Sequence, residues 1–315
     1  MGTYRNLVFE GGGVKGIAYV GALGELESRG MLEDVERVAG TSAGSIVATL
    51  LALDYSVSEM WEILWSLEFR DFLDDSRGVV RDTGRLLSDF GWYKGDFFRA
   101  WMAELIGRKT GNPEITFEEL EALRGEHGYC VLYVIGANLS TGRSEVFSAT
   151  HSRRWSVADA VRISMSIPLF FAAERGAEGQ VYVDGGLLQN YPVALFDESG
   201  SRNDKTLGLR LDSREKIEEF EGAAPETRRI DDIFEFTVAL MKTMLSAHEN
   251  QHLHSGDWAR TIYIDTAGIG ATDFDLTKAQ KQTLVENGAA GGRHYFSRKS
   301  VDSSVRVRSS RSDFP

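Results

Sequence analysis

The sequence predicts an α/β protein with a central, mostly parallel sheet and helices on both of its faces. Two observations lead to this fold class. Short apolar or β-branched segments alternate along the chain with stretches of helical periodicity, and this order is typical of a parallel sheet. The chain has 315 residues, 42% of them hydrophobic, which is enough to bury one large core.

The expected elements follow from local patterns. Seven short apolar segments are predicted to be strands: residues 6–10, 35–39, 129–138, 145–148, 180–183, 206–211 and 261–265. Helices are expected at residues 14–29, 43–53, 230–252 and 277–295. Capping boxes predict two further helix starts, at Ser56-x-x-Glu59 and Thr116-x-x-Glu119.

One domain is expected over residues 1–296. Residues 71–94 are rich in Asp, Arg and Gly, so they are predicted to be an insertion across one end of the sheet and a candidate lid. Residues 297–315 are rich in Ser and Arg and nearly devoid of large apolar side chains, which predicts a flexible C-terminal tail.

The composition excludes several classes of protein. The formal charge is −12, which disfavours nucleic acid as a partner and strongly anionic membranes as a surface. Cys130 is the only cysteine, so an intrachain disulfide and a cysteine-based zinc site are excluded. No metal-ligand spacing stands out, and no metal is expected. No segment resembles a signal peptide or a membrane span, which predicts a cytoplasmic protein and leaves secretion as an effector open.

A glycine-rich loop directly follows the first predicted strand. Gly11, Gly13 and Gly16 satisfy the G-x-G-x-x-G dinucleotide fingerprint, yet such amides can also bind an oxyanion. The second strand does not end in the acidic residue that would hold a ribose. Lys15 is followed by glycine rather than by the Ser or Thr of a P-loop. The loop alone leaves both interpretations open.

Residues 40–44 fit the pattern G-x-S-x-G, with Gly40, Ser42 and Gly44 at the fixed positions. In that motif the serine occupies a strained strand-to-helix turn, and small neighbours let the backbone fold tightly around it. A strand is predicted before Ser42 and a helix from Ala43, as the motif requires. The alternative is an ordinary N-cap serine in a β-α turn.

The two turns together favour an oxyanion over a nucleotide phosphate. The carboxyl ends of neighbouring parallel strands meet at one edge of the sheet, so the amides of the glycine loop are expected to face the carbonyl that Ser42 attacks. The predicted oxyanion hole consists of Gly11, Gly12, Gly13 and Ala43. Lys15 either is solvated or stabilises this loop and a nearby anionic head group.

An aspartate is the better candidate for the base that activates Ser42. Residues 180–183 are predicted to form a strand that ends just before Asp184. Gly185 and Gly186 have no side chains and so leave room beside the carboxylate. The alternative is a plain Asp-Gly turn. None of the six histidines has a comparable setting: His127, His151, His248, His252, His254 and His294.

These three motifs, in this order, resemble the patatin-like phospholipase family. Three further segments are similar to the family: Ser164-Met165-Ser166-Ile167-Pro168 with Phe170-Phe171, Asn190-x-Pro192, and residues 264–277. The resemblance implies a three-layer α/β/α fold and a Ser-Asp dyad acyl hydrolase that needs no histidine, calcium or other cofactor. It also implies the roles: Ser42 as nucleophile, Asp184 as base, and Gly11, Gly12 and Gly13 as oxyanion donors.

The sequence therefore predicts a lipid acyl hydrolase of the phospholipase A or lysophospholipase type, working through an acyl-serine intermediate. Its expected partner is a lipid substrate at a membrane or micelle surface, contacted peripherally. Two alternatives stay open: an NAD(P)-dependent oxidoreductase of Rossmann type, and a catalytically silent lipid-binding module. An activator and the oligomeric state are open as well.

Overall fold

A computed structural model of the chain describes residues 3–72, 90–198, 201–212 and 257–309, with isolated positions between 230 and 243 and with side chains as far as residue 299. Its strands are β1 (Asn6–Phe9), β2 (Arg37–Thr41), β3 (Gly91–Tyr93), β4 (Val131–Asn138), β5 (Arg143–Phe147), β6 (Leu169–Phe171), β7 (Glu174–Arg175), β8 (Val181–Asp184), β9 (Thr206–Asp212) and β10 (Thr261–Asp265). No helix among the described residues is long and apolar enough to cross a bilayer.

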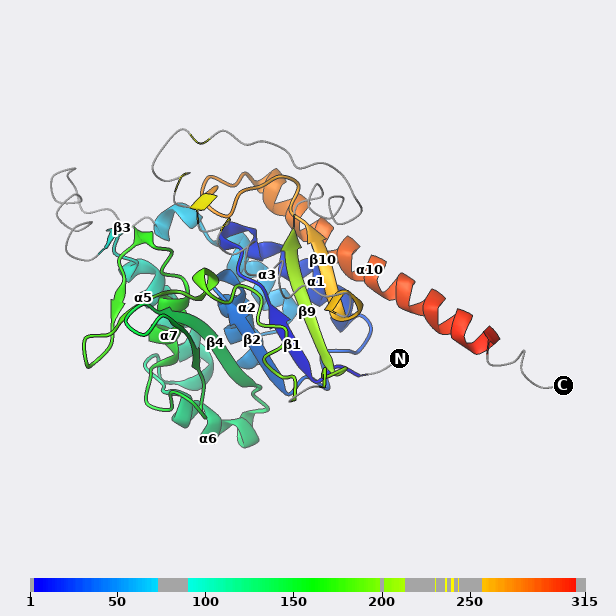
Figure 1. Cartoon of the computed structure of the whole chain (residues 1–315), viewed down its shortest axis with the longest axis horizontal. Helices are drawn as coiled ribbons and strands as arrows, with labels where there is room; N and C mark the ends of the chain where they lie inside the picture. Colours follow the sequence, from blue (N-terminus) through cyan, green and yellow to red (C-terminus); the bar gives the residue numbers. More distant parts are fainter. Residues whose placement is uncertain are drawn as a thin grey trace.

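Eight of the described strands form one sheet in the order β10-β9-β1-β2-β4-β8-β7, with β5 paired to β4 (Figure 1). The other two, β3 and β6, pair with each other in a small separate sheet. Its centre is parallel, because β1 pairs with β2 and with β9, β2 pairs with β4, and β9 pairs with β10. The pairs β4–β5, β4–β8 and β7–β8 are antiparallel. In this register the ends of β1 and β2 meet, with Phe9 beside Gly40. The expected mostly parallel sheet is confirmed.

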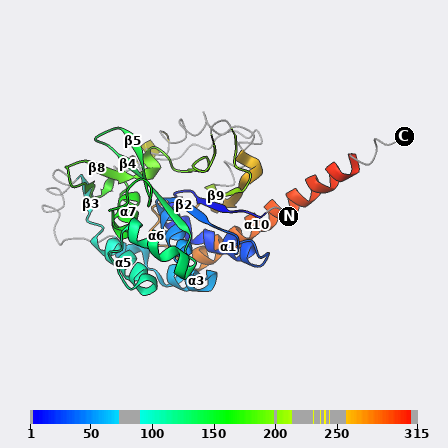
Figure 2. The ribbon, with the colours of Figure 1, turned by 90° about the horizontal axis from the view of Figure 1, so that it is seen from below.

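Helices pack against the sheet (Figure 2). They are α1 (Ala18–Glu27), α2 (Ala43–Ala52), α3 (Val57–Ser66), α5 (Asp96–Thr110), α6 (Phe117–His127), α7 (Val157–Ser164) and α10 (Lys278–Ser309). Leu7 and Val38 of the central strands belong to the large core, and their neighbours Val8 and Ala39 face the other way and pack with Phe196. This alternation is what buried strands between two covering layers require. Both predicted capping boxes are formed.

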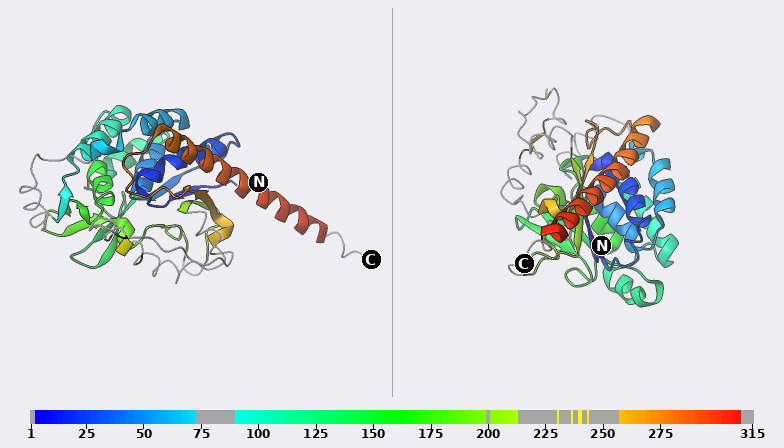
Figure 3. Two further views of the ribbon diagram at one scale, coloured as in Figure 1. Left: turned by 90° about the horizontal axis from the view of Figure 1, so that it is seen from above. Right: turned by 90° about the vertical axis from the view of Figure 1, so that its right-hand side faces the viewer.

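The helix α10 lies against α1 at very short range. A Cβ added at Gly21 would lie 1.9 Å from the carbonyl oxygen of Val285, and one at Gly288 would lie 1.9 Å from that of Ala18. Only glycine permits this approach. The helix then continues to Ser309 and projects from the body of the protein (Figure 3). The prediction that it ends near residue 295 is corrected, and the helix includes the first part of the expected tail.

Two other expectations need adjustment. The second strand spans Arg37–Thr41 rather than residues 35–39, because its pairing with both neighbours continues through Gly40, a residue of low strand propensity. The helix expected at residues 14–29 is a 3-10 turn, η1 (Gly13–Ile17), followed by α1. Most of the expected lid at residues 71–94 and of the helix at residues 230–252 lies outside the described residues.

Candidate active site

Ser42 stands between the end of β2 and the start of α2. Its backbone angles are φ 51° and ψ −128°, which are strained for a residue with a side chain and cost on the order of 1–3 kcal/mol. Hydrogen bonds hold the turn: the Ser42 amide donates to the Ser164 hydroxyl at 2.8 Å, and the Ser45 amide donates to the Ser42 carbonyl at 2.8 Å. The hydroxyl therefore lies at the positive end of the α2 dipole.

The glycines of the motif are required by close packing. A Cβ added at Gly40 would lie 2.1 Å from the Gly44 carbonyl oxygen, and one at Gly44 would lie 2.5 Å from the Phe9 carbonyl oxygen. Such contacts are far shorter than van der Waals distances. The backbone at Ser42 is thus enclosed on two sides, which explains how its strained conformation is maintained.

The glycine loop lies against this turn. A Cβ added at Gly11 would lie 3.1 Å from the Cβ of Ser42, and one at Gly16 would lie 2.9 Å from the Cβ of Ala43. Gly13 has φ +57°, and the next amide, that of Val14, donates to the Ala271 carbonyl at 3.0 Å. The loop and the serine turn therefore meet at one edge of the sheet, as the parallel arrangement predicts.

One predicted oxyanion donor is already engaged. The Gly11 amide donates to the carbonyl of Asn190 at 3.0 Å, so in this conformation it does not face a substrate. Within the part of the chain that the structure describes, the amides of Gly12 and Gly13 have no protein acceptor. Of the four predicted donors, Gly12, Gly13 and Ala43 are those whose amides have no acceptor among the described residues, and the role of each stays a prediction.

Asp184 ends β8 and begins the short 3-10 turn η3 (Gly185–Leu187). Its carboxylate accepts the Gly186 amide at 2.7 Å, and its backbone amide donates to the Ser166 carbonyl at 2.8 Å. A Cβ at Gly185 would lie 2.3 Å from the Ile135 carbonyl oxygen, so glycine lets the turn pack directly on β4. These contacts fix the carboxylate at the end of its strand.

The environment of Asp184 makes its carboxylate a stronger base. The side chain is 3% exposed, and this burial raises the pKa of Asp184 from 3.8 to about 7, against the opposing effects of the Gly186 amide and of a hydrogen bond from Ser42. The Ser42 Oγ atom also lies 3.6 Å from the Met165 sulfur. The structure thus brings Ser42 and Asp184 together, although five strands, β3 to β7, lie between them in the sequence. In the sheet only β4 separates β2 from β8.

Asn190 links the two halves of the site. Its side-chain amide donates to the Gly11 carbonyl and to the Glu10 carboxylate, both at 3.3 Å. The Glu10 carboxylate also accepts the Leu211 amide at 2.8 Å and pairs with Arg210 at 3.4 Å, although both charged residues are almost fully buried. No role is predicted for Glu10 from the sequence. An acidic residue at the end of an otherwise apolar strand was the available signal.

The described histidines have other partners. His127 stacks on Tyr129, with 5.2 Å between ring centres. The Nδ1 atom of His151 lies 2.9 Å from the hydroxyls of Ser148 and Thr150, and His294 is exposed on α10. The three remaining histidines lie outside the described residues.

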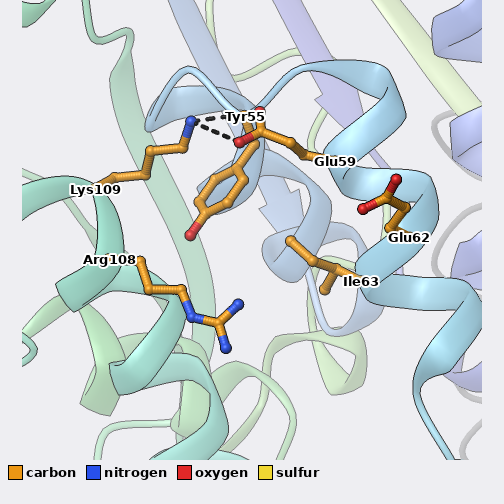
Figure 4. A pocket seen from close by; sticks show the side chains of 6 residues that line it. All are labelled: Tyr55, Glu59, Glu62, Ile63, Arg108 and Lys109. Carbon is orange, nitrogen blue, oxygen red and sulfur yellow. Dashed lines mark hydrogen bonds and ion pairs between the residues drawn. The ribbon is translucent and has the colours of Figure 1, made fainter.

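A polar pocket between α3 and α5 is a separate feature (Figure 4). It is lined by Tyr55, Glu59, Glu62, Ile63, Arg108 and Lys109. Lys109 donates to Glu59 at 3.1 Å, and the Tyr55 hydroxyl donates to the Leu105 carbonyl at 2.7 Å. Tyr55 follows the carboxyl end of α2, whereas Ser42 precedes its first turn, so about 15 Å of helix separates them. This pocket therefore lies apart from the Ser42–Asp184 pair.

The sequence profile described as "Patatin-like phospholipase" matches residues 7–197, which is more than half of the chain and includes Ser42, Asp184 and the glycine loop. The chain belongs to the patatin-like phospholipase family. This membership argues against the alternative of a Rossmann-type oxidoreductase, which rested on the glycine fingerprint of the loop.

Relatives in sequence agree with this membership, and a solved structure shares the fold. The chain is 33% identical to the uncharacterized protein YqhO of Bacillus subtilis, over 90% of this chain and 95% of that protein. It is 28% identical to a cGAMP-activated phospholipase of Pseudomonas aeruginosa, over 60% of this chain and 54% of that one. The crystal structure of VipD from Legionella pneumophila has the same fold, with a TM-score of 0.64 at 19% identity, covering 94% of this chain and 67% of VipD.

Proposed function

We propose that this protein is a lipid acyl hydrolase in which Ser42 is the nucleophile and Asp184 is the base. The observation that carries the proposal is the pairing of a strained serine at a helix N-terminus with a buried carboxylate that accepts its hydrogen bond. A pKa of about 7 at Asp184 suits a general base at neutral pH, because the group is then available unprotonated and still has appreciable proton affinity.

The proposed reaction has two steps. Ser42 Oγ attacks the ester carbonyl carbon while its proton moves to Asp184, and the amides of Gly12, Gly13 and Ala43 bind the oxyanion. The tetrahedral intermediate collapses, the carbon–oxygen bond to the alcohol breaks, and Asp184 returns the proton to that alcohol. Water then attacks the acyl-Ser42 ester, Asp184 accepts the proton of the water, and the fatty acid leaves as Ser42 regains its proton.

The substrate class is proposed to be phospholipid or lysophospholipid. Support comes from relatives named as phospholipases, including a lysophospholipase of Candida glabrata that is 26% identical over 63% of this chain. The Met165 side chain beside Ser42 Oγ adds an apolar, adaptable wall that suits an acyl chain.

A fluorophosphonate probe tests the proposal directly, because it reacts with activated serines. We expect labelling of the wild-type chain, loss of labelling in Ser42→Ala, and hydrolysis of specific species in a mixed lipid extract by the wild type only. The hydrolysis should persist with excess chelator, since the proposed steps use no metal. An unlabelled wild-type protein that binds lipid without cleaving it would instead identify a silent lipid-binding module.

A further inference from the structure

A small two-stranded sheet lies outside the main one and presents two exposed apolar side chains. β3 and β6 are parallel, with Gly91 beside Leu169 and Tyr93 beside Phe171. Leu169 is 43% exposed, and Phe90, which directly precedes β3, is 46% exposed. The register therefore places both residues at the same end of the small sheet.

Both residues have an unfavourable backbone. Phe90 and Leu169 each have φ 63°, a left-handed conformation that glycine or asparagine adopts easily and that bulky residues adopt at a cost. The side chains of Phe90 and Leu169 are more than 40% exposed, so full burial of an apolar group does not offset the cost of this backbone conformation. Local strain of this kind is concentrated at functional sites.

The β6 strand is connected by short contacts to the candidate active site. The segment just before it supplies the Ser164 hydroxyl and the Met165 sulfur that contact Ser42, and the Ser166 carbonyl that accepts the Asp184 amide. Arg162, 2% exposed, binds the Ser166 hydroxyl and the Ala172 carbonyl just past β6. The exposed pair is thus attached to the residues that hold Ser42 and Asp184.

A cation completes this surface. The Arg175 guanidinium lies over the Phe90 ring, 5.7 Å from its centre, and the Arg175 side chain is exposed. Apolar side chains next to a cation match the boundary between acyl chains and phosphate groups in a lipid surface. The net charge of −12 opposes a strongly anionic membrane, so the matching surface is a zwitterionic one.

We propose that Phe90 and Leu169, with Arg175, form the surface by which this protein docks on a zwitterionic lipid bilayer or micelle. This inference rests on the proposed lipid substrate, since docking here would bring the ester to the end of the sheet that holds Ser42. The two side chains enter the acyl region and the guanidinium meets a phosphate oxygen.

The test uses vesicles of phosphatidylcholine and the Ser42→Ala chain, so that binding is measured without hydrolysis. Phe90→Asn with Leu169→Asn removes the apolar groups while asparagine tolerates the positive φ. We expect vesicle cosedimentation of this variant to fall roughly tenfold or more, from the lost burial of two apolar side chains. Its thermal midpoint should equal or exceed that of the parent, which a merely structural role would not predict.

Leu139→Asn is the matched control, because Leu139 is 47% exposed and lies outside this small sheet. It should leave vesicle binding within about twofold, as expected for a scattered surface residue. Unchanged binding in the Phe90/Leu169 variant, or an equal loss in Leu139→Asn, would overturn the docking proposal. So would a change in oligomeric state without a change in vesicle binding, which would assign the surface to a second copy of the chain. Failure of the proposed function is distinguishable, since it would appear as absent fluorophosphonate labelling in the wild type.

Discussion

The turn that holds Ser42 and the turn that holds Asp184 prepare their side chains in different ways. Ser42 has a strained backbone enclosed by Gly40 and Gly44, and its burial involves no charge. Asp184 has an ordinary extended backbone, φ −49° and ψ 129°, but its carboxylate is buried in a place that favours the protonated form. The free-energy cost of the Ser42 turn is backbone strain, and that of the Asp184 turn is burial of a charge. Each cost should therefore respond to a different perturbation.

The largest expected effect is on catalysis at the electrostatic turn. Asp184→Asn keeps the shape of the side chain and removes the base, so kcat/KM for a short-chain aryl ester should fall by about three orders of magnitude or more. In the wild type, kcat/KM should rise with pH through about 7, as Asp184 loses its proton. A profile that rises instead through the pH range of an unperturbed aspartate would contradict the burial argument.

The same substitution should change the pH dependence of stability. The pKa of Asp184 is about 7 in the folded protein against 3.8 for an ordinary aspartate, so the folded state binds the extra proton between these values. The contribution of Asp184 to the free energy of unfolding of the wild type is therefore fully present below pH 3.8 and is lost as the pH rises through 7. Relative to wild type, Asp184→Asn should gain up to about 4 kcal/mol between pH 4 and pH 8, measured by urea unfolding. If the difference in stability between Asp184→Asn and wild type did not change with pH, burial of the Asp184 charge would not be the cost of that turn.

The packing around Ser42 gives the next largest effect. Gly44→Ala places a methyl group 2.5 Å from the Phe9 carbonyl oxygen, and should lower the free energy of unfolding by about 1–3 kcal/mol. Gly125→Ala is the control, because a Cβ there meets no atom within 4 Å and α6 favours alanine. Equal stability of the two variants would mean that the enclosure does not maintain the turn.

The smallest effect is the strain itself. Ser42→Gly should raise the free energy of unfolding over Ser42→Ala by up to about 1 kcal/mol, because only glycine relaxes at φ 51°. Both variants lack the proposed nucleophile, so activity does not confound the comparison. If Ser42→Gly were instead the less stable of the two, flexibility of the unfolded glycine would outweigh the strain.

Much of this site followed from the sequence because its parts are local. The G-x-S-x-G motif at Ser42 and the Asp-Gly-Gly turn at Asp184 each follow a recognisable strand, and the order of the strands predicts that parallel ends meet at one edge. The family comparison confirms the fold and the membership. The roles of the two residues stay predictions until the variants are measured.

The parts that the sequence did not reveal depend on distant contacts. The Gly11 amide, predicted as an oxyanion donor, donates in this conformation to the carbonyl of Asn190, which lies far along the chain. Leu169 has a positive φ at the position where β6 pairs with β3, a strand more than 70 residues earlier in the chain. Neither partner has a spacing or periodicity that identifies it in advance, so such details require coordinates.

The order of the strands has a consequence for the time at which the glycine loop can form during synthesis of the chain. β1 is synthesised first, but its neighbour β9 begins at Thr206, and the glycine loop rests on Ala271, which accepts the Val14 amide. A nascent chain shorter than about 270 residues therefore contains Ser42 and Asp184 but lacks the support of the loop opposite them. The glycine loop therefore gains this support only after Ala271 has been synthesised.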